Sequence, residues 1–389
     1  MKIPFYYNLM NLWRRKLTTS ITILGITLVV FSFTAVLMLA HGLEETLAET
    51  GSEQNVIILR KGADTEVLSW IMREAGNIIK TFPEIASLPD GSPLYTTDLS
   101  VIINLKKKIS NDMGNIAVRG TTHRTFLLRP YINIIAGRKF KEGTTEIIVG
   151  KSIHKSFQEC NIGNKLKFGN QQWQIVGIFD TDGKAFDSEI WGDVNEMMPA
   201  FKRPVYSTML FRLKNKNDFR LIKKKLENDP RLNQLVAKIE KNYYFEQSAF
   251  MATFIRIVGL VITLTFSIGS IIGAMITMYT SVTNRKKEIG TLRALGFRRR
   301  NILISFLTES LIISILGGFI GLFLATFLQF YTFSTTNFAS FTEMAFDFKL
   351  STSIGSYSML FAIFMGLLGG FFPSIRASRM EIVDSLRAI

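Results

Sequence analysis

Four long apolar stretches dominate the hydrophobic pattern of the chain. Each of them lacks Asp, Glu, Lys and Arg, and they cover residues 18–41, 257–284, 310–342 and 350–375. Because a bilayer core about 30 Å thick needs roughly 20 helical residues at about 1.5 Å each, every stretch is long enough to cross a membrane. The pattern therefore predicts four transmembrane helices, at residues 17–41, 254–283, 303–333 and 351–374.

The first stretch is predicted to be a retained anchor and not a cleaved signal peptide. Its apolar core is far longer than the roughly 7 to 15 residues of a signal peptide, and no Ala-x-Ala pattern follows it between Met38 and Gly42. Residues 1–16, which precede it, combine aromatic and leucine side chains with a basic end. They fit either an interfacial helix along the inner leaflet or a basic flank with an aromatic belt.

Basic flanks orient the four spans. Basic side chains gather before the first span, between the second and third, and after the fourth, at Lys2, Arg14, Arg15, Lys16, Arg285, Lys286, Lys287, Arg293, Arg298, Arg299, Arg300, Arg376, Arg379 and Arg387. The positive-inside rule assigns all three flanks to the cytoplasm, which four spans allow. We therefore expect residues 1–16, 284–300 and 375–389 to be cytoplasmic, and residues 42–250 and 334–350 to lie on the opposite side.

Residues 42–250 alternate β-rich runs with helical ones, which is typical of a mixed domain. Strands are predicted at residues 55–60, 100–105, 115–119, 146–149, 165–168 and 173–179. Helices are predicted at residues 65–82, 152–159, 194–201 and 218–228. The predicted fold class is an α+β membrane protein, in which four transmembrane helices carry a large mixed α+β extracytoplasmic domain between helices one and two.

Composition narrows the possible functions. Most of the formal net charge of +15 comes from the thin cytoplasmic flanks, where basic side chains meet anionic lipid, so we expect a lipid membrane and no nucleic acid as partner. The single cysteine, Cys160, cannot form an internal disulfide. Together with three scattered histidines (His41, His123 and His154), it makes no zinc site.

Two segments imitate catalytic motifs. Gly150-Lys151-Ser152 follows a predicted strand, but a phosphate loop needs a glycine where Thr145 stands. The acidic run from Asp180 to Asp193 lacks the ligand spacing of a calcium loop, so a solvated loop or a partner-binding edge is expected there. Other catalytic signatures are absent from the sequence, and we expect no enzyme activity and no catalytic, cofactor or metal site in this chain.

The spans themselves carry small residues and one charge. Small residues at a spacing of three or four let helices pack closely in lipid, and the candidates are Gly269, Gly273, Gly317, Gly318, Gly321, Gly366, Gly369 and Gly370. Glu309 interrupts an otherwise neutral span, about nine residues beyond Arg300. Because an unpaired charge in a membrane is costly, we expect Glu309 to face protein and to pair with a basic residue of the 281–300 segment.

Three pieces of sequence carry a family resemblance. They are NLWRRKLTTSITILGI (residues 11–26), NRKKEIGTLRALGFRRRNILISFLTESLIISILGGFIG (284–321) and GLLGGFFPSIRASRMEIVDSLR (366–387). The chain resembles the permease subunits of ABC transporters of the MacB, LolC/LolE and FtsX type. Its outer segment resembles their periplasmic core domain more loosely, through VRGTTHRTF, GRKFKEG, EIIVG and WQIVGIFD.

The resemblance implies a site and a set of partners. Residues 284–300 would form a cytoplasmic coupling helix that docks on an ATPase subunit, with the contact carried by Arg285, Lys287, Glu288, Ile289, Gly290, Leu292, Arg293, Ala294, Leu295 and Gly296. ATP and Mg would bind a separate ABC ATPase subunit, present in two copies beside a second permease, identical or different. A periplasmic adaptor or acceptor protein is a further expected partner, and the expected location is the bacterial inner membrane.

The resemblance also implies a mechanism. ATP hydrolysis in the partner would move the periplasmic domain by mechanotransmission and drive export of a substrate from the periplasm or outer leaflet. Two alternatives stay open on the same scaffold: LolCDE-like release of lipoproteins from the inner membrane, and FtsX-like regulation of a cell-wall hydrolase without transport.

Overall fold

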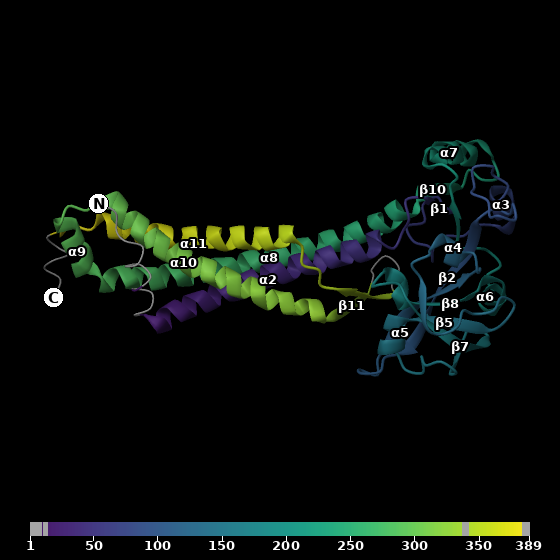
Figure 1. Cartoon of the computed structure of the whole chain (residues 1–389), viewed down its shortest axis with the longest axis horizontal. Coiled ribbons are helices and arrows are strands. Elements are labelled where there is room, and N and C mark those ends of the chain that lie inside the picture. The colour runs from purple at the N-terminus through teal and green to yellow at the C-terminus, as the bar shows by residue number, and fades with distance from the viewer. Residues whose placement is uncertain (1–9, 11–14, 337–341, 383–389) are drawn as a thin grey trace. The chain divides into compact units, whose positions relative to one another are not determined.

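Four helices in the described part of the chain are long and apolar enough to cross a membrane. They are α2 (Lys16–Ala48), α8 (Glu240–Asn284), α10 (Arg299–Thr326) and α11 (Thr352–Arg379), and a short helix, α9 (Lys286–Ala294), lies between α8 and α10 in sequence (Figure 1). The computed structural model describes residue 10, residues 15–336 and residues 342–382. The predicted interfacial helix at residues 1–16 lies almost entirely outside the described residues.

The chain divides into two compact units, each taken here by itself. The helical unit comprises residues 1–41, 253–331 and 348–389, and the outer unit comprises residues 42–252 and 332–347. Helices α2 and α8 belong to both units. Helix α2 continues past the end of its apolar run, and α8 begins well before the start of its own. Both helices are therefore longer than the predicted spans, whose boundaries at residues 41 and 254 remain predictions; the two units divide after residues 41 and 252. Strong helix formers such as Glu, Leu and Ala follow the apolar run of α2, so its backbone hydrogen bonding simply continues.

The third span ends earlier than predicted. Helix α10 stops at Thr326, a 3₁₀ turn follows (Phe327–Phe330), and β11 (Thr332–Thr336) then pairs antiparallel with β12 (Glu343–Asp347). We call these two strands the hairpin. Aromatic and β-branched residues predominate in the first strand, and these side chains favour extended backbone. The hairpin belongs to the outer unit, although it connects two helices of the helical unit.

Small residues bring the helices of the helical unit together. A Cβ added to Gly318 would lie 2.7 Å from the Cβ of Ala362, and one added to Gly317 would lie 3.0 Å from the Cβ of Ile26. The same crowding holds for the other predicted packing glycines of α10 and α11, namely Gly321 against α2, Gly366 and Gly370 against α10, and Gly369 against α8. Gly269 and Gly273 differ, since the described chain places no atom within 4 Å of either added Cβ. Their predicted close packing is not found among the described residues.

The outer unit is built on a ten-stranded sheet. Its strands run in the order β10-β1-β9-β2-β3-β8-β5-β7-β4, and β6 pairs with β7. The strands are β1 (Asn55–Arg60), β2 (Tyr95–Lys106), β3 (Met113–Thr121), β4 (Asn133–Gly137), β5 (Glu146–Gly150), β6 (Lys165–Phe168), β7 (Gln171–Asp180), β8 (Glu189–Asp193), β9 (Thr208–Arg212) and β10 (Leu235–Ile239). The helices are α3 (Arg73–Ile79), α4 (Thr125–Leu128), α5 (Lys151–Ser156), α6 (Val194–Ala200) and α7 (Phe219–Asn228), with 3₁₀ turns η1 (Ala185–Ser188) and η2 (Lys216–Asp218). This arrangement confirms the predicted α+β class.

All six predicted strands are present in the ten-stranded sheet, but its strands β4, β8, β9 and β10 were not predicted. The predicted helix at residues 65–82 is wrong in its first half, since only α3 forms. The residues before α3 bond to the strands instead. The Ser69 hydroxyl accepts a hydrogen bond from the backbone N–H of Arg60 at 2.9 Å, and Ile71 forms an isolated antiparallel β-bridge with Tyr206. Tertiary contacts thus override a helical pattern here.

Two apolar cores hold the sheet. One packs around Trp173 and Ile190, and the other around Phe211 and Ile222, and all four side chains are fully buried. Strand β8 lies between β3, to which it is parallel, and β5, to which it is antiparallel. The residues around β8 are therefore central to the sheet.

Candidate coupling site

The predicted coupling segment folds as the short helix α9. Arg285 is its N-cap residue, and the helix ends in a Schellman arrangement: Gly296 N–H donates to the Arg293 carbonyl at 3.1 Å, and Phe297 N–H donates to the Leu292 carbonyl at 3.1 Å. Gly296 adopts a φ of 91°. Side chains other than glycine are strained at that angle, so the glycine is what lets the chain turn into α10.

One face of α9 is fixed to the helical unit. Ile289 is buried in an apolar cluster that includes Ile302 and Phe306 of α10, and Leu292 packs against the same cluster. Gly290 is buried beside them. Apolar burial of this kind holds the helix in one orientation.

A buried ion pair fixes the start of α9. The Arg285 Nη1 lies 2.9 Å from Glu309 Oε2, and the side chains are only 6% and 4% exposed. Arg285 also pairs with the half-exposed Glu288 at 3.0 Å, and its guanidinium lies 4.9 Å from the ring centre of Phe306. Glu309 thus faces protein and pairs within the 281–300 segment, as the sequence predicts. Because breaking a buried pair leaves an uncompensated charge, the contact restricts where α9 can lie.

The opposite face of α9 is exposed. Lys287, Glu288 and Ala294 are exposed there, and so is Leu295, with 66% of its surface accessible. Gly296 continues this face, while Arg293 is half-buried and donates to the Phe297 carbonyl at 3.3 Å. The structure thereby separates the predicted site residues into an anchoring set (Arg285, Ile289, Gly290 and Leu292) and an exposed set (Lys287, Glu288, Ala294, Leu295 and Gly296).

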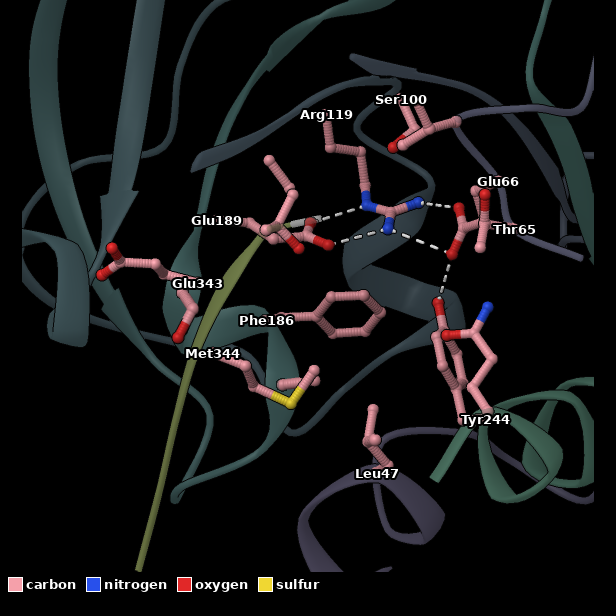
Figure 2. Close-up of a pocket in the computed structure, with 16 residues that line it drawn as sticks. Leu47, Thr65, Glu66, Ser100, Arg119, Phe186, Glu189, Tyr244, Glu343 and Met344 are labelled. Atoms are coloured by element: carbon pink, nitrogen blue, oxygen red, sulfur yellow. Dashed lines mark hydrogen bonds and ion pairs between the residues drawn. The ribbon is translucent and has the colours of Figure 1, made fainter. Parts of the chain in front are cut away.

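The outer unit contains a buried charge cluster that sequence reasoning missed (Figure 2). Arg119 of β3 pairs with Glu66 at 2.5 Å, with Glu189 of β8 at 2.8 Å and with Asp98 of β2 at 3.2 Å. Tyr244 of α8 donates to Glu66 at 2.7 Å. Arg119, Glu66, Glu189 and Tyr244 line a small cavity of about 60 Å³. Helix α8 therefore makes a direct polar contact with this cluster.

A second arginine extends the cluster. Arg129 is fully buried, and its Nε lies 2.9 Å from Oε1 of Glu240, the first residue of α8. Its Nη1 lies 3.4 Å from Asp98. Glu240 also accepts hydrogen bonds from Asn55 at 2.8 Å and from the Ser52 N–H at 3.1 Å. The start of α8 is thus tied to the sheet by a buried, multiply bonded carboxylate.

Glu66 and Arg119 are both charged at neutral pH. Burial acts to raise the pKa of Glu66, but the charge and hydrogen bonds of Arg119 outweigh it and hold that pKa below its ordinary value. Burial acts to lower the pKa of Arg119, and the charges of Glu189 and Glu66 keep it well above the ordinary value. No sequence pattern signals this cluster, because its members come from segments far apart in the chain.

The two segments that imitate catalytic motifs have structural roles. Lys151 forms an ion pair with Asp180. The expected solvated loop is wrong for part of the acidic run: Asp187 is 5% exposed and accepts from the Thr181 N–H at 2.7 Å, and Asp193 is 1% exposed and caps α6. Their backbone N–H partners explain why these carboxylates are buried. Among the described residues, no group of three His, Cys, Asp or Glu side chains could hold a metal ion.

Two family models cover most of the chain. The MacB-like periplasmic core domain matches residues 19–229, and the FtsX-like permease C-terminal region matches residues 245–382. Among solved structures, the periplasmic region of MacB from Actinobacillus actinomycetemcomitans aligns with 50% of this chain and 92% of its own length, at 10% identity and a TM-score of 0.39.

Curated relatives match nearly the whole chain. The macrolide export ATP-binding/permease protein MacB of Bdellovibrio bacteriovorus is 24% identical over 96% of this chain and 59% of its own length. The pyoverdine export ATP-binding/permease protein PvdT of Pseudomonas entomophila is 24% identical over 96% of this chain and 58% of its own length. The uncharacterized ABC transporter permease YvrN of Bacillus subtilis is 37% identical over 30% of this chain. The chain thus spans less than two thirds of the MacB and PvdT relatives. Since the periplasmic core model alone matches more than half of its residues, the chain belongs to the MacB-like family of ABC transporter permeases.

Proposed function

We propose that the chain is a permease subunit that couples ATP hydrolysis by a separate ABC ATPase to movement of its outer domain. The observation that carries the proposal is the two-faced helix α9. A buried ion pair and apolar packing fix one face, while the other face exposes Leu295 beside Ala294 and Gly296. An exposed leucine next to small residues on a rigidly held helix suits insertion into a cleft of a partner protein.

The proposed activity is export of a substrate from the periplasm or the outer leaflet. Two relatives are named for export of different compounds, macrolides and pyoverdine, which supports the class of activity and leaves the substrate open. In this proposal two copies of the ATPase act on two permeases, and a periplasmic adaptor or acceptor protein receives the substrate. ATP and Mg bind the ATPase.

The proposed location is the bacterial inner membrane, with α9 on the cytoplasmic side. The basic residues around α9 support this orientation through the positive-inside rule. ATP is available on that side, so docking of the ATPase on α9 requires it.

Affinity capture from native membranes tests the proposal. The tagged chain is expressed in its own host, extracted in a mild detergent, and its partners are identified by mass spectrometry. The wild-type chain is expected to recover an ABC ATPase, and Leu295→Glu is expected to reduce that recovery at least about tenfold, since tenfold corresponds to only about 1.4 kcal/mol of binding. Leu221→Glu, at a leucine of α7 that is 48% exposed, is the matched control and should recover the ATPase fully.

The outcomes separate the proposed function from its alternatives. Recovery of no ABC ATPase by the wild-type chain, or equal recovery by the Leu295→Glu variant, would overturn the proposed coupling site. The other captured proteins identify the branch: an adaptor supports export, lipoproteins support lipoprotein release, and a cell-wall hydrolase supports a regulatory role without transport.

A further inference from the structure

The 3₁₀ turn η1 contacts every segment through which the outer unit is connected to the transmembrane helices. Those connections are the end of α2, the start of α8, and the β11–β12 hairpin between α10 and α11. We call η1, residues Ala185–Ser188, the junction turn. Three of its four residues each contact a different connection, and all of these contacts lie within the outer unit.

The first residue of the junction turn contacts the end of α2. The backbone N–H of Ala185 donates to the Thr50 hydroxyl at 3.0 Å, and that hydroxyl donates to the Thr46 carbonyl at 2.7 Å. Thr50 is fully buried, and its carbonyl accepts a hydrogen bond from Tyr131. One hydroxyl therefore links the last turn of α2 to the junction turn.

The second residue contacts the start of α8. The ring of Phe186 meets the ring of Tyr244 edge-on, with centroids 5.8 Å apart, and Tyr244 donates in turn to Glu66. Figure 2 shows Phe186 beneath the guanidinium of Arg119 and beside Tyr244. The guanidinium carbons of Arg119 and Arg129 lie 5.1 and 4.5 Å from the centre of the Phe186 ring. Phe186 thus connects α8 to the buried charge cluster through geometry that favours cation–π attraction.

The fourth residue contacts the hairpin. The Ser188 hydroxyl accepts a hydrogen bond from the Ala345 N–H of β12 at 3.1 Å. Beside it, Met344 lines the same cavity as Phe186, and Glu343 pairs with Lys107 of the outer sheet at 2.6 Å. The hairpin therefore contacts both the junction turn and the residue that follows β2.

Behind these contacts the turn has little room to move independently of the sheet. Asp187 accepts hydrogen bonds from the Thr181 N–H at 2.7 Å and the Gly183 N–H at 3.1 Å. The backbone of Asp187 also lies so close to Gly150 that a Cβ there would collide with it. The next residue, Glu189, begins β8 and pairs with Arg119. A displacement of the junction turn must therefore pass into β8, which lies between β3 and β5.

We propose that the junction turn is the joint through which movement of the transmembrane helices reaches the centre of the outer sheet. The proposal rests on the proposed function, in which the ATPase supplies the movement. A few hydrogen bonds and one aromatic contact hold the three connections to the turn. Such contacts can differ between two conformations while the apolar cores stay intact, and coupling requires contacts that differ in this way.

The joint predicts a set of positioning residues, of which Thr50 gives the sharpest test. Thr50→Val removes the hydroxyl that accepts from Ala185 and keeps the shape of the side chain, whereas Thr50→Ser restores the hydroxyl. Ser207→Ala is the matched control. It removes another buried hydroxyl, whose partners are the N–H of Ser100 at 2.9 Å and the carbonyl of Ser100 at 3.4 Å, in β2 and not in the junction turn.

Hydrogen–deuterium exchange on the purified complex with its ATPase measures the coupling. Exchange in the peptide that covers residues 185–193 is compared without nucleotide and with ATP plus vanadate, and ATP hydrolysis is measured in parallel. We expect wild-type, Thr50→Ser and Ser207→Ala complexes to show a nucleotide-dependent change in exchange at least about threefold larger than that of the Thr50→Val complex. All four complexes should retain basal ATP hydrolysis.

The outcomes distinguish the two proposals. A nucleotide-dependent change in the Thr50→Val complex equal to that of the wild type would overturn the joint and leave the proposed function standing. Equal losses in the Thr50→Val and Ser207→Ala complexes would also overturn the joint, because a general loss of stability would then explain both. Absence of any nucleotide-dependent change in the wild-type complex would overturn the proposed function, and the joint with it.

Discussion

Replacing Arg129 with methionine should destabilise the outer unit strongly. The substitution removes the cation that lies 2.9 Å from Glu240 and 3.4 Å from Asp98, in a site where all three side chains are fully buried. Asp98 keeps Arg119 as a partner, but Glu240 keeps only the neutral donors Asn55 and Ser52. Loss of one partner of a buried pair costs about 3–5 kcal/mol, because the other charge stays buried without compensation.

Urea unfolding of the full chain in detergent, followed by tryptophan fluorescence, measures this effect. Trp173 and Trp191 are fully buried in the outer unit and report its unfolding. With a urea dependence of about 3 kcal/mol/M, the Arg129→Met variant should unfold at a urea concentration about 1–2 M lower. The matched control is Arg231→Met, whose exposed pair with Asp229 should cost less than about 1 kcal/mol.

A double substitution tests whether the unpaired carboxylate of Glu240 causes the destabilisation of the Arg129→Met variant. Arg129→Met combined with Glu240→Gln removes both charges and keeps a hydrogen-bond acceptor at position 240. The double variant should therefore be more stable than Arg129→Met alone, by about 1–3 kcal/mol of coupling. If the double variant is no more stable than the single one, an unpaired carboxylate is not the source of the destabilisation, and the reasoning is wrong.

Three further predictions concern other groups. Burial raises the pKa of Asp187 to about 6, above its unfolded value, so its stabilising contribution is complete below about pH 4 and is lost as the pH rises through 6. Asp187→Asn should remove about 2–3 kcal/mol from the pH dependence of the free energy of unfolding. If the urea midpoint changes with pH between 4 and 7 by the same amount in the variant as in the wild type, the raised pKa of Asp187 is wrong. Gly366→Ala should destabilise the helical unit by about 1–3 kcal/mol, because the new methyl group would collide with Ser314. Gly269→Ala should be neutral or stabilising, because nothing in the described chain lies within 4 Å of the new methyl group. Thermal melting in detergent, monitored by size-exclusion chromatography, distinguishes the two variants. Burial raises the pKa of the fully buried Cys160 to about 11, so the native chain should resist thiol alkylation at pH 8 and react rapidly in urea; modification of the native chain at the rate of a free thiol would refute this placement.

The α9 segment shows how far a local pattern can predict a site. Its charges and apolar residues predict a helix at the membrane surface, and the structure adds which face of that helix is exposed. That division depends on α10, since Ile302 and Phe306 bury Ile289 and Glu309 pairs with Arg285. A sequence lists the residues of a helix, but only the packing of a neighbouring helix decides which of them remain exposed.

The sequence by itself determined the four spans, the class of the outer unit and six of its strands, because these follow from local properties: the length of apolar runs and the alternation of side chains. Only the tertiary structure decided the junction turn and the buried charge cluster. Asp187 and Glu189 belong to an acidic run that predicts a solvated loop or a partner-binding edge. Glu189 begins β8, which pairs with β3 and β5, and Asp187 is buried with the N–H groups of Thr181 and Gly183 as donors. The positive charges of Arg119 and Arg129 are compensated by carboxylates from distant parts of the chain, such as Glu66 and Glu240. Burial of a charge depends on partners brought together by folding, and no pattern along the chain records that proximity.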